Sequence, residues 1–398
     1  MIPKIDSQIG ISIYSTTTAG IGGSIKNSPD DFEVSEVISE RALKSIKPES
    51  GYAVYRLKKR NIDTAHALSS IMKKTGMKLK ALGLKDASAV TQQYVCSNSM
   101  TKSTEKYLSE RFSLERLGFA KKPLSKKDMI GNKFKIKISG CKGDLDSFSD
   151  YSKVLNFYGY QRFGSKRPVT HLIGKAILQR DFDMAVDLIL SYTSEYDSKE
   201  NSEIRQRLAQ RENYAKYLDT VPLQMDIERI ILKEMISQDD SLRAIRAVPV
   251  PMKRFYIQAY QSYLFNLTLC EAFSNGENLF EPTEGDVCFD PKGVITKYAS
   301  GLDMRLAVPF IGYSYYKKTR FHHYISKILE SEEIAPKDFF IKELQEASNE
   351  GGFRQCAIQC TGYRTDRDVV EFTLSRGSFA TILLREIIKP EDPIRAGF

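Results

Sequence analysis

The chain has 398 residues, 41% of them hydrophobic, and a net charge of +9 at pH 7. This length is enough to bury a core and to form two domains or one elaborated domain, and the positive charge suits a polyanionic partner. The cysteines form no C-x-x-C pair, no basic-plus-apolar leader opens the chain, and no apolar run approaches the roughly 20 residues of a membrane span. A disulfide-rich secreted protein and a membrane protein are therefore excluded, and we expect a cytoplasmic protein with reduced thiols.

The first predicted elements are a strand and a helix. Within residues 25–37, Phe32 and Val34 alternate with polar residues after a proline turn, as on a strand with one buried face. A helix is expected to begin at the cap around Asp63 and to end near Gly76.

Residues 81–93 are the most informative segment for chemistry. Two apolar stretches flank a loop that contains Gly83, Lys85, Asp86 and several small residues. This pattern predicts strand, tight loop and strand, with one carboxylate held at the loop and room for a bulky ligand to approach. By spacing alone, a Lys-Asp pair in a loop is more often a solvated turn than a catalytic group.

A strongly basic segment follows over residues 116–137. Its only acidic residue is Asp128, and its basic residues are Arg116, Lys121, Lys122, Lys126, Lys127, Lys133, Lys135 and Lys137. Phe134 and Ile136 alternate with lysines, which predicts a strand with a basic outer face. Such a face is either a solubilising surface or a contact for RNA phosphates.

Residues 156–164 interleave aromatic side chains with Asn156, Gln161 and Arg162. This composition suits a surface that stacks a nucleobase and hydrogen-bonds its edge, and it suits an aromatic core strand equally well. From residue 182 onward the periodicity is mostly helical. Strands are expected to return near residues 356–360 and 369–374, before a final helix that begins at Ser378.

Metal and nucleotide cofactors are not expected. The histidines are His66, His171, His322 and His323, and the adjacent pair would point in different directions on regular structure. Cys356 and Cys360 do not complete a tetrahedral site, and the zinc deaminase, nucleophile-elbow and Rossmann patterns are absent from the sequence.

Several segments together resemble the TruD family of pseudouridine synthases. The residues that match the Gly-x-Lys-Asp and Ala-x-Thr-x-Gln signature are Gly83, Lys85, Asp86, Ala89, Thr91 and Gln93. Further matches lie in the family's order at residues 26–36, 156–164, 254–266 and 377–386. One departure is Ala87, because the family usually has Arg or Lys directly after the aspartate.

The resemblance implies an α+β fold with two domains. Residues 1–181 together with 353–398 would form a discontinuous catalytic domain with a central, mostly antiparallel sheet and flanking helices. Residues 182–352 would form an inserted α/β TRUD domain, and RNA would lie in a basic cleft between the two. The implied partner is tRNA; no membrane or protein partner is implied, and the expected state is a monomer.

The resemblance also assigns roles to individual residues. Asp86 would be catalytic and paired with Lys26, and Asp30 would orient Lys26 or the sugar. Asn156 would contact the base edge, and Tyr158 and Phe379 would stack on the base. The motif residues Gly83, Lys85, Thr91 and Gln93 would be structural. RNA contacts are expected from Arg162 and from Lys121, Lys122, Lys126, Lys127, Lys133, Lys135 and Lys137.

The implied activity is isomerisation of uridine to pseudouridine in tRNA, at position 13. One ionised carboxylate suffices without a cofactor, either by covalent attack on the nucleotide or by removing a sugar proton to give a glycal. Two alternatives stay open at this point: a non-catalytic RNA-binding protein or chaperone on the same scaffold, and a different RNA base-modifying enzyme.

Overall fold

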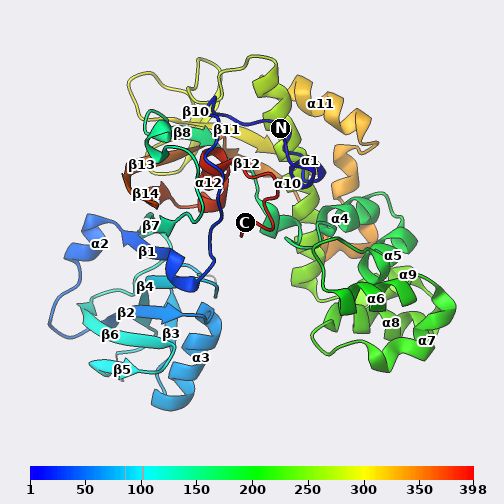
Figure 1. Cartoon of the computed structure of the whole chain (residues 1–398), viewed down its shortest axis with the longest axis horizontal. Helices are drawn as coiled ribbons and strands as arrows, with labels where there is room; N and C mark the ends of the chain where they lie inside the picture. The colour runs from blue at the N-terminus through cyan, green and yellow to red at the C-terminus, as the bar shows by residue number, and fades with distance from the viewer. Residues whose placement is uncertain (86, 101–102) are drawn as a thin grey trace.

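The computed structural model describes residues 1–85, 87–100 and 103–398 and shows an α+β protein (Figure 1). The strands of its main sheet are β1 Phe32–Ile38, β2 Tyr52–Arg60, β3 Leu79–Ala81, β4 Val90–Ser97, β5 Lys106–Leu108, β6 Phe112–Ala120, β7 Met129–Lys137, β8 Lys153–Leu155, β13 Ala357–Asp366 and β14 Val369–Ser375. A smaller sheet contains β9 Val287–Phe289, β10 Ile295–Lys297, β11 Arg305–Phe310 and β12 Gly352–Gln355.

The helices lie around and beyond these sheets. They are α1 Lys4–Gln8, α2 Glu40–Lys44, α3 Thr64–Thr75, α4 Thr170–Leu178, α5 Phe182–Ser191, α6 Lys199–Arg207, α7 Tyr214–Tyr217, α8 Asp226–Gln238, α9 Ser241–Ala247, α10 Val250–Ser274, α11 His322–Ser331 and α12 Ala380–Ile388. Two short 3-10 turns, η1 Pro29–Asp31 and η3 Tyr160–Phe163, border the candidate site described below. None of the helices in the described residues has both the length and the apolar composition needed to cross a membrane.

The main sheet has the strand order β5-β6-β2-β4-β1-β7-β14-β13-β8, with β3 beside β4. Only the β1–β4 pair is parallel, and the other pairs in the described residues are antiparallel. The expected α+β class with a mostly antiparallel sheet and flanking helices is therefore confirmed. The parallel pair brings β1 directly beside β4, which begins at Val90 within the 81–93 segment.

Strand β7 shows how the alternating sequence builds this sheet. Phe134 and Ile136 are buried, whereas Lys133 and Lys135 are exposed, as the periodicity predicts. The Phe134 ring stacks on Phe372 of β14 at a centroid distance of 5.3 Å. This contact holds β7 against β14 and places Phe134 and Ile136 on the buried face.

The predictions for helix ends had two outcomes. For α3 the prediction is confirmed, because Asp63 accepts a hydrogen bond from the His66 amide at 3.0 Å and Gly76 closes the helix with a φ of 71°. For α12 the predicted helix forms, but its predicted start is wrong. The helix begins at Ala380 rather than Ser378, and its N-cap Phe379 makes no side-chain cap hydrogen bond.

A buried charge network fastens α12 to the N-terminal segment. Arg385 Nε lies 2.6 Å from Asp6 Oδ2, and its Nη1 lies 3.2 Å from Glu386 Oε1, with all three side chains fully buried. Tyr160 of η3 donates a hydrogen bond to the same Asp6 at 2.7 Å. Because each charge has a partner, this network joins three segments that are distant in sequence.

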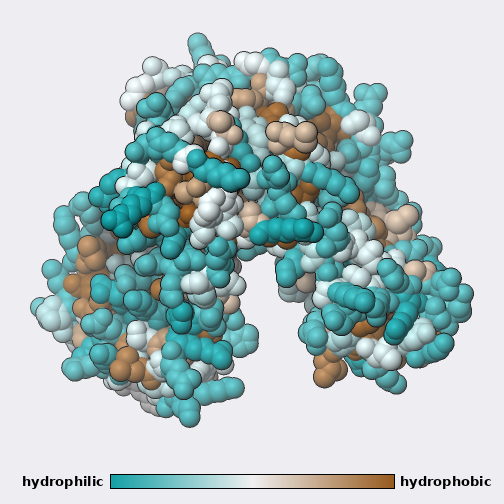
Figure 2. All heavy atoms as spheres, in the orientation of Figure 1, coloured by the Kyte–Doolittle hydropathy of each residue, from teal (hydrophilic) through white to brown (hydrophobic). Residues whose placement is uncertain are grey.

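Two arms extend from the upper part of the molecule. Figure 1 shows β2 to β6 with α3 in one arm and α5 to α9 in the other, and Figure 2 shows a hollow between them. The predicted domain boundaries at residues 181/182 and 352/353 do not coincide with gaps in packing: α10 packs on α4, and β12 pairs with β11. The division into two domains stays a prediction.

Candidate active site

A cavity of about 730 Å³ brings together several segments that the sequence singled out. Its walls come from the segment before η1, β1, the loop before β4, β7, the turn after η3, the start of α12 and the C-terminus. The C-terminus, marked in Figure 1, lies above the hollow that Figure 2 shows in the same orientation. This cavity is therefore the candidate active site.

Asp86, the predicted catalytic residue, lies outside the described residues. Its sequence neighbours Lys85 and Ala87 both line the cavity, and so does Lys26. Lys26 has a φ of 58°, a left-handed conformation that is uncommon for a residue with a side chain, and its Nζ lies 4.9 Å from the centroid of the Phe32 ring. A strained backbone held by its surroundings is common at functional sites.

A buried ion pair anchors the loop just before Asp86. Lys85 Nζ donates to Glu36 Oε1 at 3.0 Å, and the two side chains are 7% and 0% exposed. The second carboxylate oxygen of Glu36 accepts the backbone N–H of Tyr94 at 2.9 Å. Glu36 was not predicted as a site residue, although it is the last position of the matched segment 26–36.

The motif residues Gly83 and Gln93 act as a structural support. Gln93 Nε2 donates to the Gly83 carbonyl at 2.8 Å, and its Oε1 accepts from Thr64 Oγ1 at 2.9 Å. Thr64 Oγ1 also accepts the backbone N–H of Lys85 at 3.0 Å, and Lys59 Nζ donates to the Lys85 carbonyl at 3.2 Å. The sequence analysis missed Thr64 and Lys59, because neither belongs to a motif and both reach the loop from other elements.

Thr91 differs from these supports. It is 1% exposed and lines the cavity, and its Oγ1 has no hydrogen-bond partner among the described residues. Buried hydroxyl groups are almost always hydrogen-bonded. The Thr91 hydroxyl is therefore a candidate contact for a bound ligand.

Asp30 is not among the residues that line the cavity. Its carboxylate accepts two hydrogen bonds from the Arg60 guanidinium, at 3.1 and 2.6 Å, on an exposed part of the surface. Its predicted role in orienting Lys26 stays untested, and the geometry gives it a different partner.

The two aromatic residues predicted to stack on the base are not equivalent. Phe379 lines the cavity and is 37% exposed. Tyr158 is only 8% exposed, does not line this cavity, and has the Arg354 guanidinium 3.9 Å from its ring centroid. Within the same segment Phe157 and Phe163 are fully buried, so the aromatic-core interpretation describes most of it.

Asn156 is the candidate for contact with the base edge. Both polar atoms of its side-chain amide are already hydrogen-bonded within the protein. Its Nδ2 donates to the Gln355 carbonyl at 2.9 Å, and its Oδ1 accepts from Arg354 Nη2 at 2.8 Å. The geometry therefore favours a supporting role for Asn156. Arg354 was missed by the sequence analysis because its contacts join residues far apart in the chain.

The predicted basic face of β7 forms, but it faces away from the cavity. Asn132 and Phe134 line the cavity, and side chains alternate along a strand, so Lys133 and Lys135 lie on the opposite face. Lys133 lies 3.0 Å from Glu371, whose pKa is lowered chiefly by the hydrogen bond from this lysine. Lys135 and Lys137 pair with Glu371 and Asp368 at 4.0 and 3.5 Å, and the other predicted lysines, Lys121, Lys122, Lys126 and Lys127, are exposed between β6 and β7.

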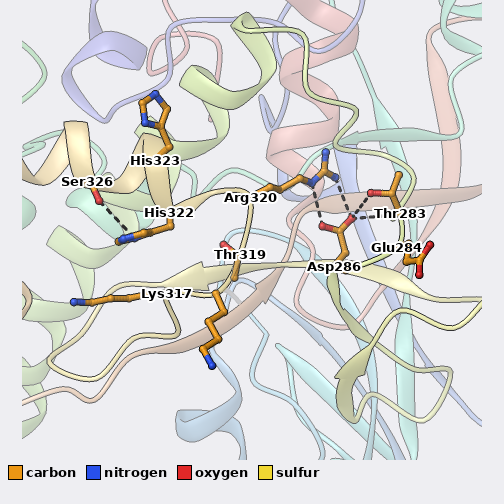
Figure 3. A pocket seen from close by; sticks show the side chains of 11 residues that line it. Thr283, Glu284, Asp286, Lys317, Thr319, Arg320, His322, His323 and Ser326 are labelled. Carbon is orange, nitrogen blue, oxygen red and sulfur yellow. Dashed lines mark hydrogen bonds and ion pairs between the residues drawn. The ribbon is translucent and has the colours of Figure 1, made fainter.

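A second depression, of about 790 Å³, contains none of the predicted site residues (Figure 3). Arg320 is held there by Asp286 at 3.1 Å, and the adjacent rings of His322 and His323 point in different directions. No group of three metal-ligating side chains is found in the described part of the chain.

Comparison with known proteins identifies the scaffold. A family model described as tRNA pseudouridine synthase D (TruD) matches residues 8–387. The chain belongs to the TruD family. It is 32% identical to a probable tRNA pseudouridine synthase D of Pyrobaculum islandicum and 30% identical to one of Methanosarcina acetivorans, covering 99% and 98% of those proteins and 100% and 99% of this chain. A solved TruD structure from Methanosarcina mazei superimposes with a TM-score of 0.83 at 28% identity over 99% of both chains.

One residue at the cavity wall departs from the TruD sequence pattern. Ala87, the departure noted in the sequence, lines the cavity and carries no charge. Lys166, an exposed residue of the turn after η3, lines the same cavity and was not predicted. It is a candidate to supply a positive charge that Ala87 cannot.

Proposed function

We propose that this protein isomerises uridine to pseudouridine in tRNA, at position 13, with Asp86 as the single catalytic carboxylate and no cofactor. The observation that supports this most is that both neighbours of Asp86 line the same cavity as Lys26 and Phe379. The TruD relatives named above are tRNA pseudouridine synthases by name.

The chemistry requires a broken N-glycosidic bond, a rotated base and a new bond to C5. No electron or external group is exchanged, so a carboxylate that attacks the nucleotide or removes a sugar proton is sufficient. A nearby cation such as Lys26 stabilises the ionised form of a carboxylate in a cavity that the substrate closes to water.

The target base must first leave its stack, which costs a few kcal/mol. Stacking on an aromatic ring returns about 1–3 kcal/mol per base, and Phe379 is the ring that offers surface to the cavity. Its place at the start of α12 makes Phe379 our candidate for the stacking residue, in preference to Tyr158.

We place the body of the tRNA in the hollow between the two arms (Figure 2). In this arrangement residues 1–181 with 353–398 hold the chemistry, residues 182–352 form the opposite wall, and a monomer suffices. The exposed Lys166 at the cavity then contacts the RNA backbone close to the target.

The test is carbodiimide mapping of tRNA incubated with purified protein, which reports both the reaction and the modified position. Asp86→Asn should abolish the product and keep tRNA binding, whereas Asp150→Asn, an exposed aspartate away from the cavity, should leave both unchanged. A non-catalytic RNA-binding protein would give no alkali-resistant carbodiimide adduct with the wild-type chain. A product that survives Asp86→Asn would overturn the assigned carboxylate.

A further inference from the structure

A small cavity of about 280 Å³ lies beside the candidate active site and is lined by two arginines, Arg162 and Arg354. Its other walls include Tyr158 and the adjacent Gly351 and Gly352. An added Cβ at Gly352 would meet nothing within 4 Å, so the backbone leaves this side open to a ligand.

The two arginines have no carboxylate partner in the described residues. The side chain of Arg162 donates only to Gln258 at 3.5 Å, and burial lowers its pKa. Burial likewise lowers the pKa of Arg354, with the nearby positive charge of Arg162 adding to the effect. Two half-buried cations thus lie close together with no carboxylate partner in the described residues, which is unfavourable in the isolated protein.

Two other arginines of this chain are buried, and both are paired with acids. Arg205 lies 2.8 Å from Glu228 and 3.3 Å from Asp197, and Arg385 is paired with two acids. The missing anion at Arg162 and Arg354 is therefore a local property of this cavity. It indicates a site whose negative charge comes from a ligand.

Arg354 is held in a fixed orientation. Its Nε and Nη2 donate to the main-chain and side-chain oxygens of Asn156 at 3.3 and 2.8 Å, and its plane packs on Tyr158 at 3.9 Å. Nη2 also donates to the Gly377 carbonyl at 3.4 Å. A planar guanidinium that is already immobilised binds phosphate oxygens with little further loss of side-chain entropy.

Arg354 connects this cavity to the catalytic one through its contact with Phe379. Phe379 lines the catalytic cavity, and the Arg354 guanidinium lies 5.7 Å from its centroid. We propose that Arg162 and Arg354 form a subsite for a backbone phosphate of the RNA, next to the nucleotide whose base stacks on Phe379. This inference rests on the proposed function for the identity of the RNA, and it assigns Tyr158 and Asn156 the role of positioning Arg354.

The test uses the full chain with Asp86→Asn and end-labelled tRNA ethylated at random on its phosphates. Each ethyl group removes one phosphate charge, so ethylated positions depleted from the bound fraction mark the phosphates that the protein contacts. We expect depletion at a phosphate next to the target uridine. Adding Arg162→Gln should abolish that depletion. It should also weaken the binding of tRNA without ethyl groups about tenfold, the usual loss for a hydrogen bond to a charged group.

Two further variants sharpen the comparison. Arg207→Gln is the matched control, because Arg207 also lies over a tyrosine ring, 5.6 Å from the Tyr217 centroid, on an exposed surface; it should keep the depletion. Arg354→Lys keeps the charge and loses the planar fork, and it should weaken the same phosphate contact while leaving the rest of the pattern intact.

An identical depletion pattern with and without Arg162→Gln would overturn the subsite. A second contrary result has two parts: inorganic phosphate competes with tRNA for Asp86→Asn but not for the variant that also carries Arg162→Gln, and no ethylated phosphate is depleted. This result would assign the cavity to free phosphate and overturn the RNA assignment. The readout is binding, so it is independent of turnover. If the wild-type chain modifies tRNA and Arg162→Gln leaves the depletion pattern unchanged, only the phosphate subsite is overturned. If the wild-type chain does not modify tRNA, the proposed function is overturned whatever the depletion pattern shows.

Discussion

Lys85 and Glu36 form an ion pair of 3.0 Å inside the protein, one residue before Asp86. The carboxylate is fully buried and the lysine side chain nearly so. Removing two charges from water costs about as much as their attraction returns, so such a pair adds little net stability. Its effect is positional: it fixes the direction in which the loop enters the cavity wall.

Glu36→Gln should therefore damage both stability and turnover, because it leaves the Lys85 ammonium buried without a counter-charge. We expect a loss of roughly 3–5 kcal/mol in the free energy of unfolding, measured by denaturant titration. The matched control is Glu33→Gln, an exposed position on the same strand. In the double variant Glu36→Gln/Lys85→Met the stability should recover in part while turnover stays low. A fully additive double variant would contradict the pairing.

Thr91→Val tests the buried hydroxyl at the cavity wall. The substitution keeps the shape and removes an Oγ1 that has no hydrogen-bond partner among the described residues. Stability should stay level or rise, since no internal hydrogen bond is lost. If the hydroxyl binds the nucleotide, kcat/KM for tRNA should fall about tenfold. Unchanged kinetics together with a stability loss would show that the hydroxyl is structural.

Local patterns in the sequence predicted much of this fold, and the reason is that they depend on neighbours in the chain. The alternation around Phe134 defines β7, and Asp63 with Gly76 defines the ends of α3. Which face of β7 meets the cavity depends on its pairing with β1 and β14, which no local pattern specifies. The lysine row was therefore predicted correctly as a strand face, and its contact with RNA stays a prediction.

The candidate site shows the same limit. The resemblance identified the loop around Asp86, Lys26 and Phe379 because they belong to motifs. It could not show that the Tyr158 ring packs on Arg354, since that contact joins two distant segments and Arg354 belongs to no motif. Side-chain contacts of this kind depend on tertiary packing, which also changes the roles that a motif suggests.

The salt dependence of RNA binding should distinguish the three lysines of β7 from Lys166 at the cavity. Lys133, Lys135 and Lys137 face away from the cavity and pair with acids of the β14 region. Replacing all three with Gln should leave the slope of log K against log salt unchanged. Lys166→Gln should reduce the magnitude of that slope by about 0.7–0.9, the value for one phosphate contact. A flattened slope in the triple variant alone would return the β7 face to the RNA interface.

The last prediction concerns stability in mild acid. His171 is buried between Phe163 and Tyr263, with ring-centroid distances of 5.2 and 5.0 Å, and burial lowers its pKa to about 4. An unfolded histidine titrates near 6.5, so between these two values the unfolded chain binds more protons than the folded one. Stability should therefore be complete above the unfolded pKa and should fall as the pH drops towards the folded pKa, by roughly 3 kcal/mol at 1.36 kcal/mol per pKa unit.

The measurement for His171 is the free energy of unfolding by denaturant across this pH range. His171→Phe keeps the aromatic packing and removes the titrating group, so its stability should depend less on pH over the same window. His323→Gln changes an exposed histidine that forms no ion pair in the described residues and should leave the slope as in the wild type. Because acidic residues also titrate at the low end of the window, the difference between these two variants, rather than either curve alone, isolates the buried imidazole. Equal slopes in both variants would show that His171 does not titrate as a buried group.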